Sequence, residues 1–250
     1  MMDIWQYVML ALAGLAAGFL NVMAGGGSLL TVPVMVFLGL PGPVANGTNR
    51  IAILVQNITA VITFFHKGHS DFRLSLTLSL CSLPGAAAGA YLGTQLEGIW
   101  FNRTLAIIML GVMFVMAFDK KPHQDGGVPC TKPRNNVLGH VLMVLAGLYG
   151  GFIQVGVGFI LMAILHNVMR LNLVTVNMHK VFITMSFSIV ALLVFAARVE
   201  IQWLLGLCLA VAYSIGAWLG VHLSIRGGER GIKIVLNVVL AIFIIKLLFF

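Results

Sequence analysis

The chain has 250 residues, of which 60% are hydrophobic and 9% are charged, and its formal net charge is +8 at pH 7. This composition excludes an ordinary soluble domain and predicts an integral membrane protein in the lipid bilayer. The positive charges lie in loops between apolar runs rather than on one face, so nucleic acid is not an expected partner.

Apolar runs of membrane length follow one another along the chain. A bilayer span needs about 20 apolar residues, and backbone groups in lipid must bond within their own segment, which predicts helices. The expected fold class is all-α, a polytopic membrane protein with about eight transmembrane helices in two repeated four-helix halves. The predicted elements cover residues 4–38, 46–65, 74–92, 101–118, 137–165, 171–197, 201–223 and 232–250.

The first element is too long to cross the membrane as one helix. Residues 4–38 would form a helix of about 50 Å, whereas the hydrocarbon core is about 30 Å thick. Gly25-Gly26-Gly27 is the expected interruption, because glycine favours departure from helical geometry. The alternatives are a single tilted, broken span and a re-entrant hairpin. The broken span is the preferred prediction for the first helix of each half, with the equivalent break at residues 156–158.

The two halves share three blocks of sequence in the same order. Residues 14–25 match 147–158 at an offset of 133, residues 48–50 match 178–180 at 130, and residues 89–93 match 216–220 at 127. Three collinear blocks predict an internal duplication. Broken spans would make the two repeats parallel, whereas hairpins would make them an inverted pair. Small residues spaced as in Gly85-Ala-Ala-Ala-Gly89 predict close helix packing.

The predicted domains are a first membrane repeat at residues 1–118, a linker at 119–136 and a second membrane repeat at 137–250. The linker combines Lys and Arg residues with several turn-forming glycines and prolines. By the positive-inside rule it is expected to face the cytoplasm. Four spans in each half would then place both termini in the cytoplasm as well.

Two cations, Arg50 and Lys180, lie inside apolar segments at equivalent positions of the two halves. A charge near the bilayer centre costs about 2.5 to 3.5 kcal/mol on insertion scales, so such residues usually face a polar cavity. The alternative for Arg50 is a side chain that reaches the membrane interface. Every acidic residue lies in a loop or at a span end, which disfavours a cation carrier. The pair therefore predicts a site for a small anionic substrate.

Amides, hydroxyls and glycines surround these two cations. Such donors suit an oxyanion, and helix ends at the glycine breaks add backbone N–H groups. For each amide, hydrogen bonding between helices is the alternative role. The predicted substrate-binding residues are Asn21, Gly25, Gly26, Gly27, Thr48, Asn49, Arg50, Gln154, Gly156, Gly158, His179 and Lys180. His179 is also a candidate proton carrier, which makes the proton a candidate coupling ion.

The sequence contains no HExxH, GxSxG or phosphate-binding GK[ST] pattern, so an enzyme is not expected. Cys81, Cys130 and Cys208 lack pair spacing. His66 and His69 share one short loop and predict an interfacial turn rather than a metal site. No catalytic residue, cofactor or metal is predicted.

Three stretches carry a resemblance to a known family. They are Gly18-Phe-Leu-Asn-Val-Met-Ala-Gly-Gly-Gly27-Ser-Leu-Leu-Thr-Val-Pro33, Ala45-Asn-Gly-Thr48-Asn49 and Gly150-Gly-Phe-Ile-Gln154-Val-Gly-Val-Gly158. In these stretches the chain resembles the TauE/SafE sulfite exporter family, also called the toluene sulfonate uptake permeases. The second half departs from the family pattern, with Phe159 and Ile160 after Gly158 and His166 in place of a proline. A milder kink is therefore the alternative for the second break.

The resemblance implies a secondary transporter, an exporter of a small sulfur-containing anion such as sulfite or an organosulfonate, in the bacterial inner membrane. Alternating access at a midplane site is the expected mechanism. An anion channel, or a carrier for another small anion such as acetate or sulfate, is the alternative. A homodimer is a further expectation.

Overall fold

The structure is a computed structural model that describes residues 4–96, 98–118 and 136–249. The predicted linker lies outside these ranges, apart from its last residue. The elements are α1 (Ile4–Met23), α2 (Ser28–Phe37), α3 (Gly42–His66), α4 (Phe72–Gln95), α5 (Gly98–Phe118), α6 (Asn136–Phe152), α7 (Val157–Met162), the π-helix η1 (Ala163–Val168), α8 (Leu173–Arg198) and α9 (Trp203–Phe249). The all-α prediction is confirmed for the described residues, since every one of these elements is helical.

Helix α9 consists of two helical segments that meet at a kink. Gly228 has φ 52° and ψ −151°, a conformation that glycine adopts readily. The two segments cover residues 203–223 and 232–249 of the predicted spans 201–223 and 232–250. Within the described residues, the helices long and apolar enough to cross a membrane are Gly42–His66, Phe72–Gln95, Leu173–Arg198 and Trp203–Gly228.

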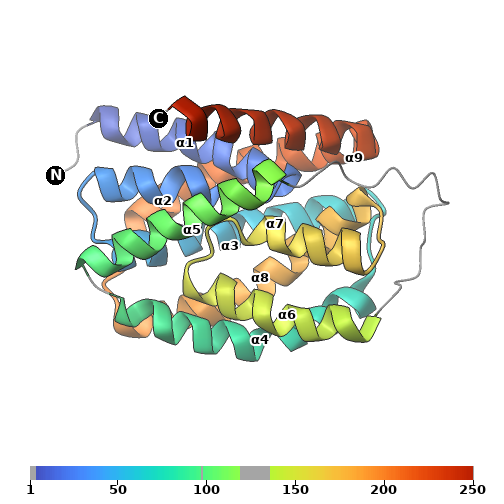
Figure 1. Cartoon of the computed structure of the whole chain (residues 1–250), viewed down its shortest axis with the longest axis horizontal. Helices are drawn as coiled ribbons and strands as arrows, with labels where there is room; N and C mark the ends of the chain where they lie inside the picture. The colour runs from blue at the N-terminus through green and yellow to red at the C-terminus, as the bar shows by residue number, and fades with distance from the viewer. Residues whose placement is uncertain (1–3, 97, 119–135, 250) are drawn as a thin grey trace.

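Helices α1 and α2 form a re-entrant hairpin. Gly27 packs against the carbonyl oxygen of Ala17, whereas an uninterrupted helix would separate the two residues by about 15 Å. The chain reverses after α1, where Gly25 has φ 90°, and α2 returns to the end of the bundle at which α1 begins (Figure 1). The preferred prediction of a broken span is therefore wrong, because the glycine run reverses the chain instead of bending it.

Helix α6 forms a second hairpin with α7 and η1. Gly139, near the start of α6, packs against Met169, which directly follows η1. The reversal lies between α6 and α7, where Gln154 and Gly156 have φ values of 61° and 74°. The alternative of a milder kink at the second break is also wrong.

The two hairpins enter the bundle from opposite ends and overlap at its centre (Figure 1). Helices α3, α4 and α5 follow the first hairpin, and α8 and the two segments of α9 follow the second. The described residues thus form six long helical segments and two hairpins. The prediction of eight spans in parallel halves is not confirmed.

The first and last described helices share one end of the bundle. Helix α1 begins and α9 ends at one end of the bundle, whereas α5 ends and α6 begins at the other (Figure 1). A hairpin returns the chain to the end of the bundle from which it came. The prediction that the linker and both termini all face the cytoplasm is therefore not confirmed.

Small residues let each hairpin pack closely against a helix of the other half. Gly85 and Gly89 of α4 lie against the backbone of α6 at Val144 and Leu148, and Gly18 of α1 lies against the backbone of α9. The prediction that the small-residue pattern of α4 serves helix packing is confirmed. The hairpins are thus exchanged, since α1 packs on the second half and α6 on the first.

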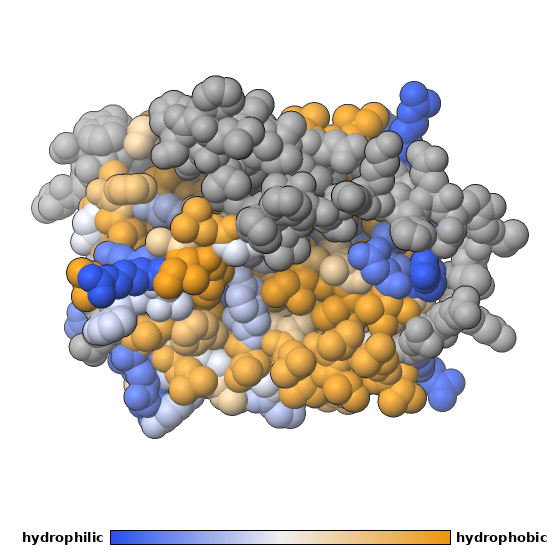
Figure 2. Space-filling view, in the orientation of Figure 1, coloured by the Kyte–Doolittle hydropathy of each residue, from blue (hydrophilic) through white to orange (hydrophobic). Residues whose placement is uncertain are grey.

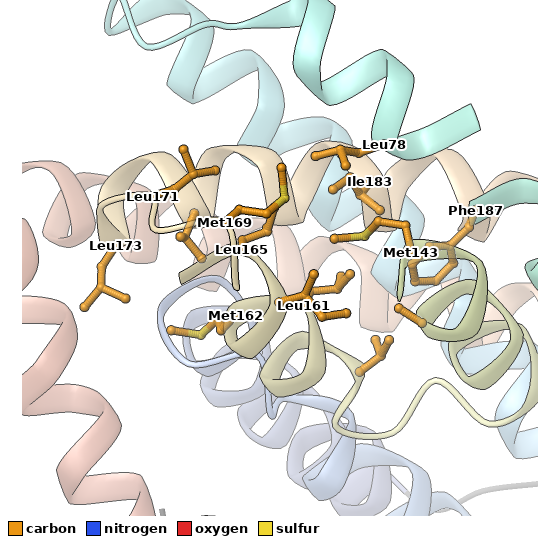
Figure 3. Close-up of a cluster of buried hydrophobic side chains, with 14 of the residues drawn as sticks. Leu78, Met143, Leu161, Met162, Leu165, Met169, Leu171, Leu173, Ile183 and Phe187 are labelled. Atoms are coloured by element: carbon orange, nitrogen blue, oxygen red, sulfur yellow. The ribbon is translucent and has the colours of Figure 1, made fainter. Parts of the chain in front are cut away.

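Apolar side chains fill the second hairpin and cover the outside of the bundle. Leu161 of α7 and Leu165 of η1 belong to one buried cluster with Met143, Ile183 and Phe187 (Figure 3). On the face shown in Figure 2, hydrophobic residues occupy much of the middle and the most hydrophilic residues lie toward the two ends. Such an apolar band suits a protein embedded in a bilayer.

Candidate functional site

The tips of the two hairpins touch at the centre of the bundle. A Cβ atom on Gly25 would lie 2.5 Å from the Cα atom of Gly158, so the two backbones are in direct contact. Next to this contact, Gly26 faces the ring of Phe159 at similarly close range. Glycine is required at positions 25 and 158 because neither backbone leaves room for a side chain.

A small polar cavity lies beside the contact between the tips. Its lining residues are Asn21, Ser28, Ile53, Asn57, Gln154, Val157, Gly158, Lys180, Val181 and Thr184. They come from both hairpins and from helices α3 and α8. The free volume is about 10 Å³, which is roughly the room that one water molecule needs. The lining contains one cation and no carboxylate.

Lys180 supplies the positive charge of the cavity. Its side chain is 2% exposed, and Nζ donates to the carbonyl oxygen of Val22 at 2.7 Å and to Oδ1 of Asn177 at 2.8 Å. Val22 lies in the last turn of α1, whose carbonyl groups have no partner within the helix and attract a cation. Because an ammonium group has three donors, one N–H of Lys180 remains for the cavity.

Arg50 is fully buried and caps the second hairpin. Its guanidinium donates to the carbonyl oxygens of the last three residues of α6, Gly150, Gly151 and Phe152. Its Nη1 also donates to Oε1 of Gln154 at 2.9 Å. Arg50 is not among the residues that line the cavity. The structure therefore brings Lys180 to the cavity and places Arg50 behind its wall.

The two cations hold the hairpins in a reciprocal pattern. Arg50 stands on α3 of the first half and binds the hairpin of the second, whereas Lys180 stands on α8 and binds the hairpin of the first. Their surroundings differ, because the ring of Phe195 lies 4.4 Å from the Arg50 guanidinium carbon while the cavity opens beside Lys180. Only one member of the pair can contact a ligand there.

A chain of amide groups ends at the cavity. Asn21 Nδ2 donates to Gln56 Oε1 at 2.9 Å, and Gln56 Nε2 donates to Asn57 Oδ1 at 3.4 Å. Because Oδ1 of Asn57 accepts, its Nδ2 is the free end of the chain, and this atom is buried without a partner. An unpaired buried donor costs about 1 to 3 kcal/mol. A ligand that supplies an acceptor at this point would remove that cost.

Gln154 is held in an unusual conformation in the cavity wall. Its φ of 61° is rare for a residue other than glycine. Its Oε1 accepts from Arg50, and its Nε2 donates to Oγ of Ser188 at 2.9 Å. Strained backbone conformations cluster at functional sites. Here the strain places an amide with defined orientation beside the contact between the tips.

The predicted residues Thr48 and Asn49 lie outside the cavity and connect helices. Asn49 Oδ1 accepts from Thr31 Oγ1 at 3.0 Å and from the Tyr213 hydroxyl at 3.1 Å, which links α3 to α2 and α9. Thr48 Oγ1 accepts from the backbone N–H of Gln202 at 3.1 Å. Both residues therefore take the alternative role, which is hydrogen bonding between elements.

The remaining predicted residues also lie around the cavity rather than in it. His179 Nδ1 is 2.7 Å from Oγ of Ser75 on α4, and its Nε2 is buried without a partner. Gly156 precedes α7 in a left-handed conformation, and Gly27 precedes α2. These two glycines form the turns from which the second arm of each hairpin begins.

Three polar residues of the cavity are missing from the predicted site: Ser28, Asn57 and Thr184. In the sequence, Asn57 and Thr184 are polar residues in apolar runs, and nothing else there distinguishes them as site residues. Ser28 begins α2 without a side-chain cap, and the next two backbone N–H groups, of Leu29 and Leu30, donate to the carbonyl oxygens of Gly26 and Gly27. Within the described residues, no three His, Cys, Asp or Glu side chains gather closely enough to hold a metal ion.

An apolar band, two re-entrant hairpins that meet at the centre and a polar cavity at their contact define a membrane transport protein. The chain belongs to the family described as Sulfite exporter TauE/SafE, which residues 10–247 match. The resemblance seen in the sequence is thereby confirmed. The protein is a membrane transporter, and neither the family description nor the names of its relatives indicate an enzyme.

Curated relatives of similar length carry transporter names. "Probable membrane transporter protein ORF9" of Sinorhizobium sp is 26% identical over 239 residues, which cover 96% of this chain and 91% of that protein. "Probable membrane transporter protein YfcA" of Escherichia coli K12 is 24% identical over 241 residues, covering 93% and 86%. "Probable membrane transporter protein YunE" of Bacillus subtilis 168 is 23% identical over 264 residues, covering 94% of each chain. No solved structure matches the chain.

Proposed function

We propose that this chain is a secondary transporter that exports a small sulfur-containing anion, such as sulfite or an organosulfonate, across the bacterial inner membrane. The main support is the cavity at the contact between the tips, which offers Lys180 and several amide and hydroxyl groups and no carboxylate. Hydrogen bonds from a charged donor to an oxyanion are short and strong. The family description, which names sulfite export, agrees with this chemistry.

Alternating access around the contact between the tips is the proposed mechanism. The two halves run in opposite directions, which fits an inverted repeat in which each hairpin controls access from its own side. The cavity of about 10 Å³ is smaller than an anion of several heavy atoms, so entry requires the hairpins or their side chains to move. A cavity too small for the anion supports a carrier over a channel, which needs a continuous pore.

Counterflow in proteoliposomes tests the carrier mechanism. Unlabelled sulfite inside the vesicles should accelerate the uptake of labelled sulfite severalfold, because a carrier returns faster with substrate bound. Uptake that is indifferent to internal sulfite would indicate a channel instead. Vesicles that take up no more sulfite than empty liposomes would contradict the proposed function.

Substitution of Lys180 by alanine should reduce the initial rate of sulfite uptake by about tenfold or more, equivalent to about 1.4 kcal/mol. The reason is that Lys180 is the only charged residue in the cavity lining. Rates should be normalised to monodisperse, folded protein. Lys67→Ala is the matched control, since Lys67 is exposed at the end of α3. A wild-type rate in Lys180→Ala would contradict the assignment of the site.

We also propose that the end of the bundle from which the linker leaves faces the cytoplasm. The basic residues of the described elements at this end are Lys67 after α3, Arg73 in α4, Arg170 before α8, and Arg226, Arg230 and Lys233 near the kink of α9. At the opposite end lie fewer basic residues, Arg103 in α5, Arg198 in α8 and Lys246 in α9. The positive-inside rule then places both chain ends in the periplasm.

Reporter fusions at two positions test this orientation. Alkaline phosphatase fused after Phe250 should be active, because that enzyme folds only in the periplasm, and a fluorescent protein at the same position should be dark. Fusions within the linker, after Gly127, should give the reverse pattern. Active phosphatase in the linker and inactive phosphatase at the carboxyl terminus would contradict the proposed orientation.

A further inference from the structure

The cavity offers a bound anion a single positive charge in direct contact. Lys180 is the only charged residue of the lining, and the two groups that accept from it, on Val22 and Asn177, are neutral. The end of α1 at Val22 carries a partial negative charge, but the start of α2 carries a partial positive one and its first residue, Ser28, lines the same cavity. The charge of Lys180 therefore remains available.

Arg50 adds no second charge in contact with the cavity. Its guanidinium donates to three carbonyl oxygens at the end of α6, where the helix carries about half a negative charge that offsets part of the positive one. The ring of Phe195 covers it at 4.4 Å, and the side chain of Gln154 lies between it and the cavity. A ligand in the cavity cannot bond to Arg50 without displacing these groups.

Asn57 supplies a contact of a different kind, a neutral donor. The residue is 1% exposed, and its Nδ2 has no partner although it is buried. Its Oδ1 accepts from Gln56, which in turn accepts from Asn21. The amide cannot turn its oxygen toward the cavity without breaking this chain. Asn57 is therefore suited to an anion oxygen that needs a hydrogen bond but no second cation.

Building on the proposed function, we propose that this cavity selects singly charged oxyanions over doubly charged ones, with Lys180 compensating the charge and Asn57 donating to an oxygen. A second negative charge would lie in a cavity with little room for water and no further cation in contact. Burial of such an unpaired charge is costly. The favoured class is hydrogensulfite and simple alkanesulfonates, and the disfavoured class is sulfate and sulfonates with a second acidic group.

Two probes of nearly equal shape separate charge from size. Methanesulfonate carries one negative charge and sulfate carries two, and the molecules differ by a methyl group in place of one oxygen. We expect methanesulfonate to inhibit uptake of labelled sulfite at a concentration about tenfold lower than sulfate does, or lower still. Equal or stronger inhibition by sulfate would overturn the charge selection while leaving the proposed transport intact. Absence of any sulfite uptake would overturn both.

Methylphosphonate controls for the methyl group. It carries one negative charge in mildly acidic buffer and two in mildly alkaline buffer, whereas methanesulfonate carries one in both. We expect the inhibition by methylphosphonate, relative to that by methanesulfonate, to fall on the order of tenfold from the acidic to the alkaline buffer. A constant ratio would overturn the inference.

Asn57→Asp brings the test to the site itself. A carboxylate of the same shape would pair with Lys180 and remove the positive charge that the anion needs. A ligand that binds the native state raises the melting temperature, and we expect methanesulfonate to do so for the wild type but not for Asn57→Asp. Asn102→Asp, at an exposed position of α5, should keep the response. If methanesulfonate raised the melting temperature of Asn57→Asp as much as that of the wild type, the role of Asn57 would be overturned. If Asn57→Asp does not fold, the ratio of inhibition by methylphosphonate to inhibition by methanesulfonate decides whether the cavity selects by charge.

Discussion

Alanine at position 25 should keep the hairpin tips apart and destabilise the protein by about 3 kcal/mol or more. The added Cβ would lie 2.5 Å from Cα of Gly158, and a backbone cannot move aside as a flexible side chain can. Overpacking typically costs about 1 to 3 kcal/mol, and the left-handed conformation of Gly25, with φ 90°, adds about 1 to 2 kcal/mol. Thermal unfolding in detergent measures the loss, and sulfite uptake should fall with it.

Gly39→Ala is the matched control for this substitution. Gly39 has nearly the same φ, 93°, but a Cβ atom there would meet no other atom within 4 Å. Its replacement should therefore cost only the backbone term of about 1 to 2 kcal/mol. The difference between the two variants isolates the contact between the hairpin tips. Equal melting temperatures would show that the tips do not meet as described.

Removal of the Arg50 side chain should also destabilise the protein by about 3 kcal/mol or more. Each buried acceptor left without a donor costs about 1 to 3 kcal/mol, and Arg50→Ala would leave the carbonyl oxygens at the end of α6 and Oε1 of Gln154 unpaired. Arg50→Lys should lie between the wild type and Arg50→Ala, because an ammonium group cannot reach all these acceptors at once. Melting temperatures of the purified variants measure both effects.

Arg103→Ala is the control for the loss of an arginine from the bundle. Arg103 is exposed on α5, with its guanidinium carbon 5.4 Å from the ring centre of Trp100. Its removal should change the stability by no more than about 1 kcal/mol, the usual scale of an exposed cation–π contact. If Arg50→Ala and Arg103→Ala had the same melting temperature, the capping of α6 by Arg50 would be refuted. Lys180→Ala should lose more sulfite uptake per folded molecule than Arg50→Ala does.

The helical segments of the bundle could be predicted from the sequence because apolar length alone decides them. The predicted spans 46–65 and 74–92 lie within α3 and α4, and the span 171–197 coincides with α8 from residue 173 onward. The direction of the chain after each glycine break could not be predicted in this way. A bent helix and a reversed one share the same apolar run, and the difference depends on packing such as that of Gly27 against Ala17.

The same limit explains why the sequence predicts the same role for Arg50 and Lys180. Their positions in the repeat are equivalent, and nothing in the local sequence tells a free cation from one that caps a helix. Tertiary packing distinguishes them, since Phe195 covers Arg50 while Lys180 borders the cavity. Asn57 is likewise absent from the predicted site, because its unpaired Nδ2 follows only from the side-chain contact in which Gln56 donates to its oxygen.

The exchange of hairpins between the halves has a consequence for biosynthesis. Helices α1 and α2 leave the ribosome first, yet α8, which carries Lys180, and α9, against which α1 packs, are made last. The early hairpin can bond to α3 through Asn21 and Thr31, but its contacts with α8 and α9 form only after most of the chain has been inserted. A chain truncated before α8 would therefore keep the contacts of its first hairpin with α3 and lose those with the second half.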